Sequence, residues 1–214
     1  VSANPAGGGG PAGPGRAAPD SKYPPFPAER SVALVLFGIS LALYLATLCW
    51  DPCPGLPTQA LLTHLGAAPA APGFLDPLWG WLVRGGARLP GLSAAGWTGL
   101  FSAICGAACV SLMGRLMTRV NYRGLKGLAP ASKRRAIQAR GLSGCVAGLY
   151  LACCTPFWVV STRSLPGAFH LLLLLGAAWE FSEYQQRGSL RHLGLLGLLL
   201  GIGIPEFATF IVYL

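Results

Sequence analysis

Acidic side chains are the first candidates for chemistry, because the chain has only seven of them among 214 residues. Asp51 follows a long uncharged run and stands beside Trp50. A carboxylate in that position could act as a general base and take the proton from an acceptor hydroxyl. The alternative is a solvated residue at a helix end, since Pro52 would stop the helix there, and this is the commoner role of such a residue.

Two further acids stand beside proline. Asp76 precedes Pro77, which favours the N-cap of a helix over Pro77–Val83. Glu206 follows Pro205 inside an apolar segment, and an ionisable group at membrane depth is a functional-site hypothesis by default. A position of Glu206 at the membrane interface is the alternative. His170, in an earlier apolar segment, could pair with Glu206 across a helix bundle.

The remaining polar residues indicate ordinary roles. Glu183 and Arg187 have the i,i+4 spacing of a helical ion pair. His64 is expected on the polar face of a short helix. Most of the seven Cys lie in apolar runs, where Cys acts as a small hydrophobe, and they do not form a metal-ligand pattern. Cys49 and Cys53 are spaced so that a disulfide is possible but not required.

Apolar residues make up 53% of the chain and charged residues only 11%, where soluble domains average about 25%. Long uncharged runs predict helices that cross a membrane, each near the ~20 residues that a bilayer requires. We therefore expect an all-α, polytopic transmembrane helix bundle. The five predicted spans are residues 32–50, 91–114, 142–161, 165–180 and 193–214.

The segments between the spans carry the charge. Residues 1–30 are rich in Pro and Gly and predict a disordered tail before a helical domain over 31–214. A stretch over 51–90 contains two short amphipathic pieces, Thr58–Leu65 and Pro77–Val83. A loop over 115–140 is strongly basic. The chain ends within an apolar run, so we expect it to continue beyond Leu214.

The distribution of Lys and Arg orients the predicted spans. Thirteen lie in the tail and on the side of the 115–140 loop, and three lie on the side of the 51–90 stretch. The positive-inside rule then places the N-terminus in the cytoplasm and the 51–90 stretch outside. This explains the net charge of +9 and argues against a nucleic-acid partner. Arg84 and Arg88 would be external, either anchoring the chain at the interface, the commoner role, or binding a phosphate.

Two Gly-x-x-x-Gly motifs, Gly144–Gly148 and Gly197–Gly201, have the spacing that lets helices approach closely. We expect them to pack within one bundle rather than between two copies of the chain. Gly201, Gly203 and Pro205 together predict a broken or kinked last helix.

From Val32 to Met117 the order of features resembles the N-terminal part of a bacterial multi-pass family. That family is related to the transmembrane protein O-mannosyltransferases of the GT-C glycosyltransferase superfamily. Its members have a first span, an external Asp-Ser-Gly-Glu motif, a short helix ending in Leu-Gly, a His-Pro-Pro-Gly-Tyr-Pro-Leu-Tyr motif, an amphipathic helix and a second span. The matching pieces here are Leu65-Gly66, Pro72-Gly73 and Pro77-Leu78-Trp79. The acidic motif is replaced by Pro54 to Pro57, and the His before Pro-Pro-Gly by a small residue.

The resemblance implies an integral protein of the bacterial cytoplasmic membrane that transfers a sugar from a polyprenyl-phosphate donor to an external acceptor. It implies an acidic base in the external loop, with Asp51 as the candidate in place of the missing motif and with Asp76 and Glu206 next. Arg84, Arg88 or a divalent metal would stabilise the leaving phosphate. A non-catalytic membrane scaffold or complex subunit is the alternative. A transporter is a third possibility, based on Pro205-Glu206 in a Gly-rich helix.

Overall fold

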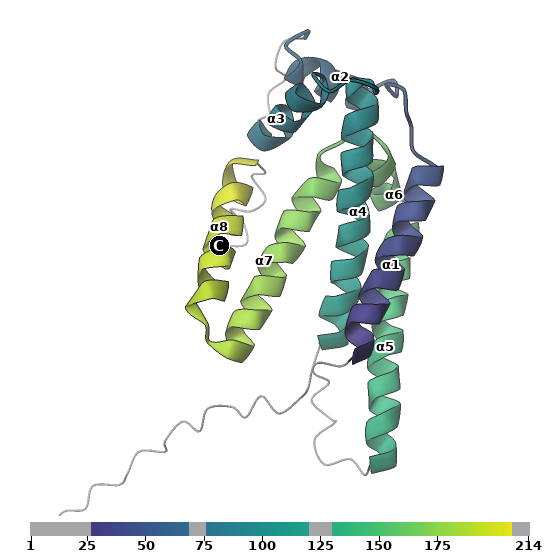
Figure 1. Cartoon of the computed structure of the whole chain (residues 1–214), viewed down its shortest axis with the longest axis vertical. Coiled ribbons are helices and arrows are strands. Elements are labelled where there is room, and N and C mark those ends of the chain that lie inside the picture. The colour runs from purple at the N-terminus through teal and green to yellow at the C-terminus, as the bar shows by residue number, and fades with distance from the viewer. Residues whose placement is uncertain (1–26, 69–75, 120–129, 207–214) are drawn as a thin grey trace, which may run out of the picture.

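The computed structural model describes residues 27–68, 76–119 and 130–206, without the side chains of 27–29 and 130–137. These residues form helices and no strand, which confirms the predicted all-α class (Figure 1). The predicted tail falls almost wholly outside the described residues. The helices are α1 (Pro27–Ala46), α2 (Leu56–His64), α3 (Pro77–Gly86), α4 (Ala94–Arg119), α5 (Pro130–Cys153), α6 (Thr155–Thr162), α7 (Gly167–Arg187) and α8 (Leu190–Glu206).

The long helices run side by side along one direction, and α2 and α3 gather across one end of the bundle (Figure 1). We call this end the α3 end, and we call the opposite end, where α4 and α7 finish, the Arg119 end. Helix α4 is central and packs against α1, α5, α6, α7 and α3. Its buried side chains are small, which lets neighbouring helices approach: Ala103, Cys105, Ala107, Cys109 and Val110.

Glycine allows the closest of these approaches, between α4 and α5. A Cβ added to Gly144 would lie 2.7 Å from the carbonyl oxygen of Gly114 on α4. One added to Gly148 would lie 3.3 Å from the carbonyl oxygen of Val110 on α4 and 2.7 Å from Leu36 Cδ1 on α1. The first Gly-x-x-x-Gly motif therefore packs within the bundle, as predicted. The second does not, since neither Gly197 nor Gly201 would bring a Cβ within 4 Å of any described atom.

The first two predicted spans differ from the helices at their ends. Helix α1 finishes at Ala46 rather than at residue 50, and the N–H of Cys49 instead donates to the carbonyl of Thr162 at 3.1 Å. Helix α4 begins at Ala94 rather than at 91, because the hydroxyl of Ser93 accepts the N–H of Gly96 at 3.1 Å and caps the helix. Local capping and tertiary hydrogen bonds, rather than the limits of the uncharged run, set these boundaries.

The predicted span over 142–161 is two helices instead of one. The part of α5 from Gln138 to Cys153 and helix α6 meet at a bend of 66°. Pro156 lies in the first turn of α6, where its missing N–H would break the hydrogen-bond ladder of a continuous helix. The predicted span is therefore a bent pair of helices, which are long and apolar enough for one membrane span only when they are taken together.

Helices α7 and α8 cover the predicted spans over 165–180 and 193–214 up to residue 206, and they pack together as a hairpin. Gly188 ends α7 with a left-handed φ of 62°, the conformation that favours glycine at this position. Helix α8 runs without interruption through Gly201 and Gly203 to Glu206, so the predicted break is absent up to that residue. Pro205 falls in the last turn of the described helix. Residues 207–214 lie outside the described part.

The predicted basic loop over 115–140 is helical at both ends. Helix α4 continues to Arg119, and α5 already begins at Pro130. The loop was predicted from the many basic residues of this segment. However, Ala, Lys, Arg and Gln between 131 and 140 are good helix formers. In contrast, both amphipathic pieces predicted in the 51–90 stretch are helices, namely α2 and α3.

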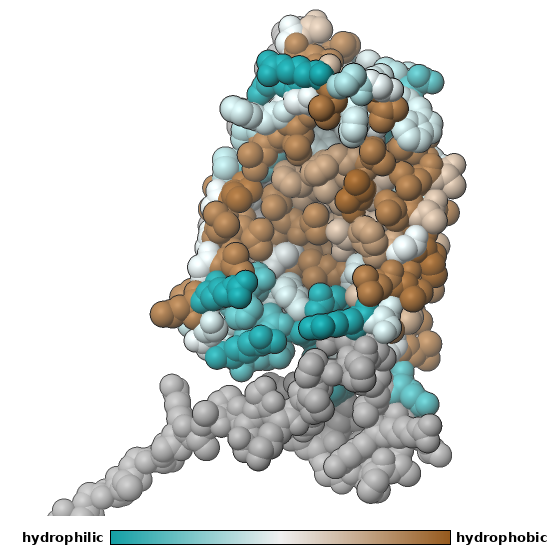
Figure 2. Space-filling view, in the orientation of Figure 1, coloured by the Kyte–Doolittle hydropathy of each residue, from teal (hydrophilic) through white to brown (hydrophobic). Residues whose placement is uncertain are grey.

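By length and apolar composition, one described helix, α4, could cross a membrane, and a second span arises if the bent α5–α6 pair is counted as one. The apolar part of α1 over Arg30–Ala46 is shorter. Figure 2 shows an apolar band between hydrophilic ends on the face that it presents. These findings favour membrane association, but they do not establish five spans.

Candidate functional site

Three ionisable side chains from separate helices meet at the α3 end. Asp76 stands at the N-cap of α3, His170 in the first turn of α7, and Glu206 at the last residue of α8. His170 Nε2 lies 3.4 Å from Asp76 Oδ1 and 3.9 Å from Glu206 Oε1. Their exposed fractions are 6% for Asp76, 7% for His170 and 2% for Glu206. We call this group the Asp–His–Glu cluster.

Glu206 holds the N-terminus of α3. Its Oε2 accepts the N–H of Leu78 and its Oε1 accepts the N–H of Trp79, both at 2.8 Å. These N–H groups have no partner within the helix, and the helix dipole favours a negative charge beside them. Glu206 thus supplies the cap that the sequence assigned to Asp76. Asp76 does occupy the N-cap position, but its side chain makes no capping hydrogen bond.

Burial and the charge of Glu206 raise the pKa of Asp76 from its usual value near 3.8 to about 6. Both effects disfavour the ionised carboxyl group, because burial removes it from bulk solvent and the negative charge of Glu206 repels its own. Within the described residues, the ion-pair partners of Asp76 and Glu206 are histidines, not Lys or Arg. Two buried carboxylates therefore lie together with little positive charge to balance them.

His64, in the last turn of α2, also faces Asp76. Its Nε2 lies 4.0 Å from Asp76 Oδ2, and only 8% of the residue is exposed. Gly80 on α3 leaves room for the ring, since a Cβ there would lie 2.9 Å from His64 Nδ1. Burial, followed by the charge of Arg84, lowers the pKa of His64. The prediction that His64 lies on a solvated polar face is wrong, because α3 covers it.

The cluster has the composition of a metal site. One ligand atom from each of Asp76, His170 and Glu206 lies within 4.8 Å of the other two, so the group could hold a metal ion. The sequence singled out Asp76 and Glu206 as separate candidates and suggested the pairing of His170 with Glu206, but it indicated no metal ligands. One sequence feature could have indicated this cluster: Asp76, His170 and Glu206 are each an isolated ionisable residue at or within an apolar stretch.

Arg84 and Arg88, the predicted phosphate ligands, lie together on the outside of the α3 end. With Trp81 and Gly85 they line a surface pocket of about 240 Å³. Trp81 is 73% exposed, whereas Trp79 and Val83 on the opposite face of α3 are buried against the bundle. The pocket is therefore lined by two arginines and an exposed aromatic ring, and most of its lining is apolar.

Asp51, the predicted general base, lies between α1 and α2 at the same end of the bundle. It is exposed, and its carboxylate takes part in no ion pair with the described residues. Its backbone carbonyl accepts the thiol of Cys49 at 3.3 Å. The structure thus brings Asp76 and Glu206 together and leaves Asp51 outside their cluster.

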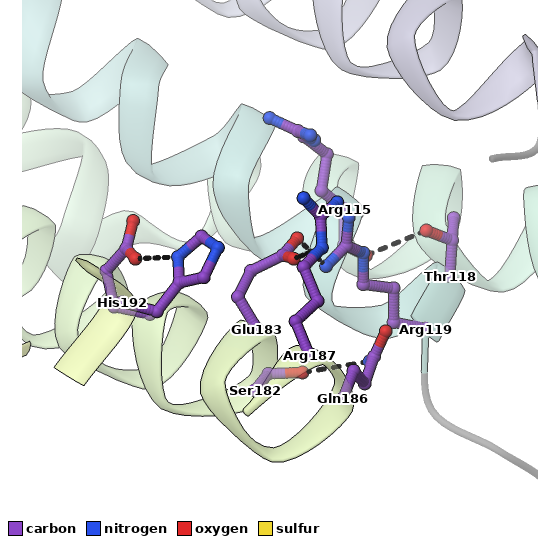
Figure 3. Close-up of polar contacts among 9 residues, drawn as sticks. Arg115, Thr118, Arg119, Ser182, Glu183, Gln186, Arg187 and His192 are labelled. Carbon is purple, nitrogen blue, oxygen red and sulfur yellow. Dashed lines mark hydrogen bonds and ion pairs between the residues drawn. The ribbon is translucent and has the colours of Figure 1, made fainter. Parts of the chain in front are cut away.

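A second polar cluster lies at the Arg119 end (Figure 3). The i,i+4 ion pair of Glu183 and Arg187 is confirmed, with Arg187 Nε 2.8 Å from Glu183 Oε2. Glu183 also pairs with Arg119, which the sequence did not suggest because Arg119 belongs to α4. The guanidinium groups of Arg115 and Arg119 lie 4.1 Å and 3.7 Å from the ring centre of Trp179, within the range of cation–π attraction.

Comparisons with protein-family models, with curated proteins and with solved structures find no match to this chain. The resemblance to the mannosyltransferase-related family therefore stays a prediction. A functional assignment depends on the geometry of the α3 end.

Proposed function

We propose that this chain belongs to an integral membrane glycosyltransferase, which transfers a sugar from a polyprenyl-phosphate donor to an acceptor at the α3 end. The observation that carries the proposal is the pocket of Arg84, Arg88 and Trp81 on an amphipathic helix. Arg binds phosphate through strong, charge-assisted hydrogen bonds. An exposed Trp beside it suits the interface where a lipid chain meets its head group.

The bundle supports a membrane location for this reaction. Large apolar side chains are exposed along three helices, where lipid would cover them: Leu34, Val35 and Ile39 on α1; Leu142, Val146 and Tyr150 on α5; Leu193 and Leu198 on α8. We propose that α1, α4, the α5–α6 pair, α7 and α8 make five spans. The N-terminus and the Arg119 end then face the cytoplasm of a bacterium, and the α3 end faces outward.

Asp51 is the best-placed base of the three predicted acids, because an acceptor can reach an exposed carboxylate and cannot reach one buried beneath α3. In the proposed reaction Asp51 takes the proton of an acceptor hydroxyl. The hydroxyl oxygen forms a bond to the anomeric carbon of the sugar, while the bond from that carbon to the lipid phosphate breaks. Arg84 and Arg88 stabilise the negative charge on the departing phosphate.

Donor binding tests this proposal. We expect the double variant Arg84→Gln/Arg88→Gln in detergent to bind a photoreactive polyprenyl phosphate at least about tenfold more weakly than the unaltered chain, because both charge-assisted contacts are lost. Arg191→Gln is the matched control, since Arg191 is also exposed but lies in the first turn of α8 at the other end of the bundle. Equal labelling of all three proteins would exclude the pocket as the donor site.

A non-catalytic scaffold or complex subunit is the second candidate. It is favoured by the replacement of the acidic motif with Pro54 to Pro57 and by an open small-residue face on α8, where Gly194, Gly197 and Gly201 meet no described atom. Such a face permits close packing of another helix. A chain that binds no lipid phosphate but copurifies with a fixed membrane partner would support this function over transfer.

A further inference from the structure

We infer that the Asp–His–Glu cluster is a binding site for one divalent transition-metal ion of the zinc class, with His64 as an additional ligand. This inference does not depend on the proposed transfer reaction. It concerns residues that are buried, whereas the transfer was assigned to exposed residues of the α3 end.

The distances match those between ligands of a shared ion. Two atoms that each lie about 2.1 Å from a tetrahedral ion are separated by about 3.4 Å. His170 Nε2 and Asp76 Oδ1 are 3.4 Å apart, and His170 Nε2 and Glu206 Oε1 are 3.9 Å apart. An ion would therefore bind with small side-chain movements, because the helix ends that carry the ligands already converge.

The charge of the cluster favours a cation. Asp76 and Glu206 together carry two negative charges when ionised, and their described ion-pair partners are imidazoles, whose ordinary form near neutral pH is uncharged. Burial of a charge is costly unless hydrogen bonds, an opposite charge or a metal ion compensate it. Glu206 already accepts two backbone N–H groups, but neither Glu206 nor Asp76 pairs with a described Lys or Arg. One divalent ion balances both carboxylates at once.

The buried ring of His64 is independent evidence for a metal ion at this position. It is more than nine-tenths buried, and its Nε2 has no hydrogen-bond partner among the described residues. That nitrogen lies 4.0 Å from Asp76 Oδ2, too far for a hydrogen bond but on the side where the carboxylates gather. A buried ring nitrogen without a hydrogen bond costs free energy unless a ligand occupies the space before it.

The donor set selects the class of ion. Imidazole nitrogen suits Zn²⁺ and related transition metals, while Mg²⁺ prefers an octahedron of oxygen atoms that includes several waters. One imidazole and two carboxylates already lie within 4.8 Å of one another, and His64, 4.0 Å from Asp76 Oδ2, would move toward them to complete a four-coordinate zinc site. The ion would join α2, α3, α7 and α8, and thereby fix the short external helices to the bundle.

Metal content and thermal stability test the inference. The purified chain is stripped with a chelator, dialysed against Zn²⁺, and its bound metal is measured by mass spectrometry, with Mg²⁺ in a parallel dialysis. We expect one equivalent of Zn²⁺, no retained Mg²⁺, and a rise in melting temperature with Zn²⁺. Asp76→Asn and His170→Gln should each weaken Zn²⁺ binding by more than about 100-fold. This loss is larger than the loss expected when a residue that only hydrogen-bonds to a metal ligand is replaced. His64→Gln should weaken Zn²⁺ binding by at least about tenfold.

His192→Gln is the matched control, because His192 also pairs with a carboxylate, that of Glu180, at 2.7 Å, and no second acid joins that pair among the residues that the structure describes. It should retain the zinc. The inference is wrong if the unaltered chain retains no zinc, or if the His170 and His192 variants retain it equally. A variant at a zinc-ligating residue is compared with the stripped, unaltered chain. If it melts at the temperature of that chain, whether Zn²⁺ is present or absent, the variant has lost zinc binding but still folds.

Discussion

Replacing Glu183 with glutamine is expected to lower the free energy of unfolding by about 3 kcal/mol, because it removes the buried carboxylate that pairs with both Arg119 and Arg187. Glu183 is buried at the Arg119 end and pairs with Arg119 from α4 and Arg187 from α7 (Figure 3). Most of the loss should come from Arg119, whose side chain is largely covered. The more exposed Arg187 can be solvated instead.

Glu180→Gln gives the comparison within the same helix. In the described part of the chain Glu180 pairs only with His192, in a more exposed position, so loss of its charge should cost about 1 kcal/mol or less. Both variants can be followed by thermal or denaturant unfolding in mild detergent. The double variant Glu183→Gln/Arg119→Gln should be less unstable than the sum of its single changes, since each removes the same ion pair. Equal losses for Glu180→Gln and Glu183→Gln would contradict this account of the Arg119 end.

The second large effect is expected at Glu206. Glu206→Gln should destabilise the junction of α3 and α8 by about 2 kcal/mol, because a glutamine amide keeps one acceptor oxygen and turns a donor toward the other N–H. The two hydrogen bonds at stake are those from Leu78 and Trp79. The measurement is amide hydrogen exchange over Pro77–Gly86 with a chelator present, so that any bound metal is removed. Exchange in α3 should accelerate.

Asp76→Asn is the control for that measurement, since Asp76 lies beside the same helix end but does not cap it. Its α3 amides should keep their protection under the same conditions. Protection that survives in Glu206→Gln, or that disappears to the same degree in Asp76→Asn, would mean that α3 is not held by Glu206.

Local patterns predicted much of the fold. The amphipathic pieces that became α2 and α3 were visible from Pro57 and Pro77 at the first turns and from the spacing of apolar residues between them. Helix ends were harder to predict from the uncharged runs. The end of α1 depends on Cys49, which donates to Thr162 of a distant helix, and the bend before α6 depends on Pro156 within an otherwise apolar run.

The candidate site was predicted only in its parts. Asp76 and Glu206 stood out because acids are scarce, but the capping of α3 by Glu206 requires α8 to return to the α3 end after its hairpin with α7. His64 was assigned to solvent, since no local pattern indicates that α3 folds over α2. Such long-range pairings follow from the packing of whole helices, which periodicity in a single segment does not encode.

The proposed reaction at the α3 end is the transfer of a sugar from a lipid-linked donor, with Asp51 as the base. The most direct measurement is transfer of labelled sugar from polyprenyl-phosphate donors in membranes that contain the full-length protein, with Asp51→Asn in parallel. The account predicts transfer by the unaltered protein and a loss of at least about 100-fold in the variant, the usual contribution of a general base. Transfer that is unchanged in Asp51→Asn, or absent from the unaltered protein with every donor, would contradict it.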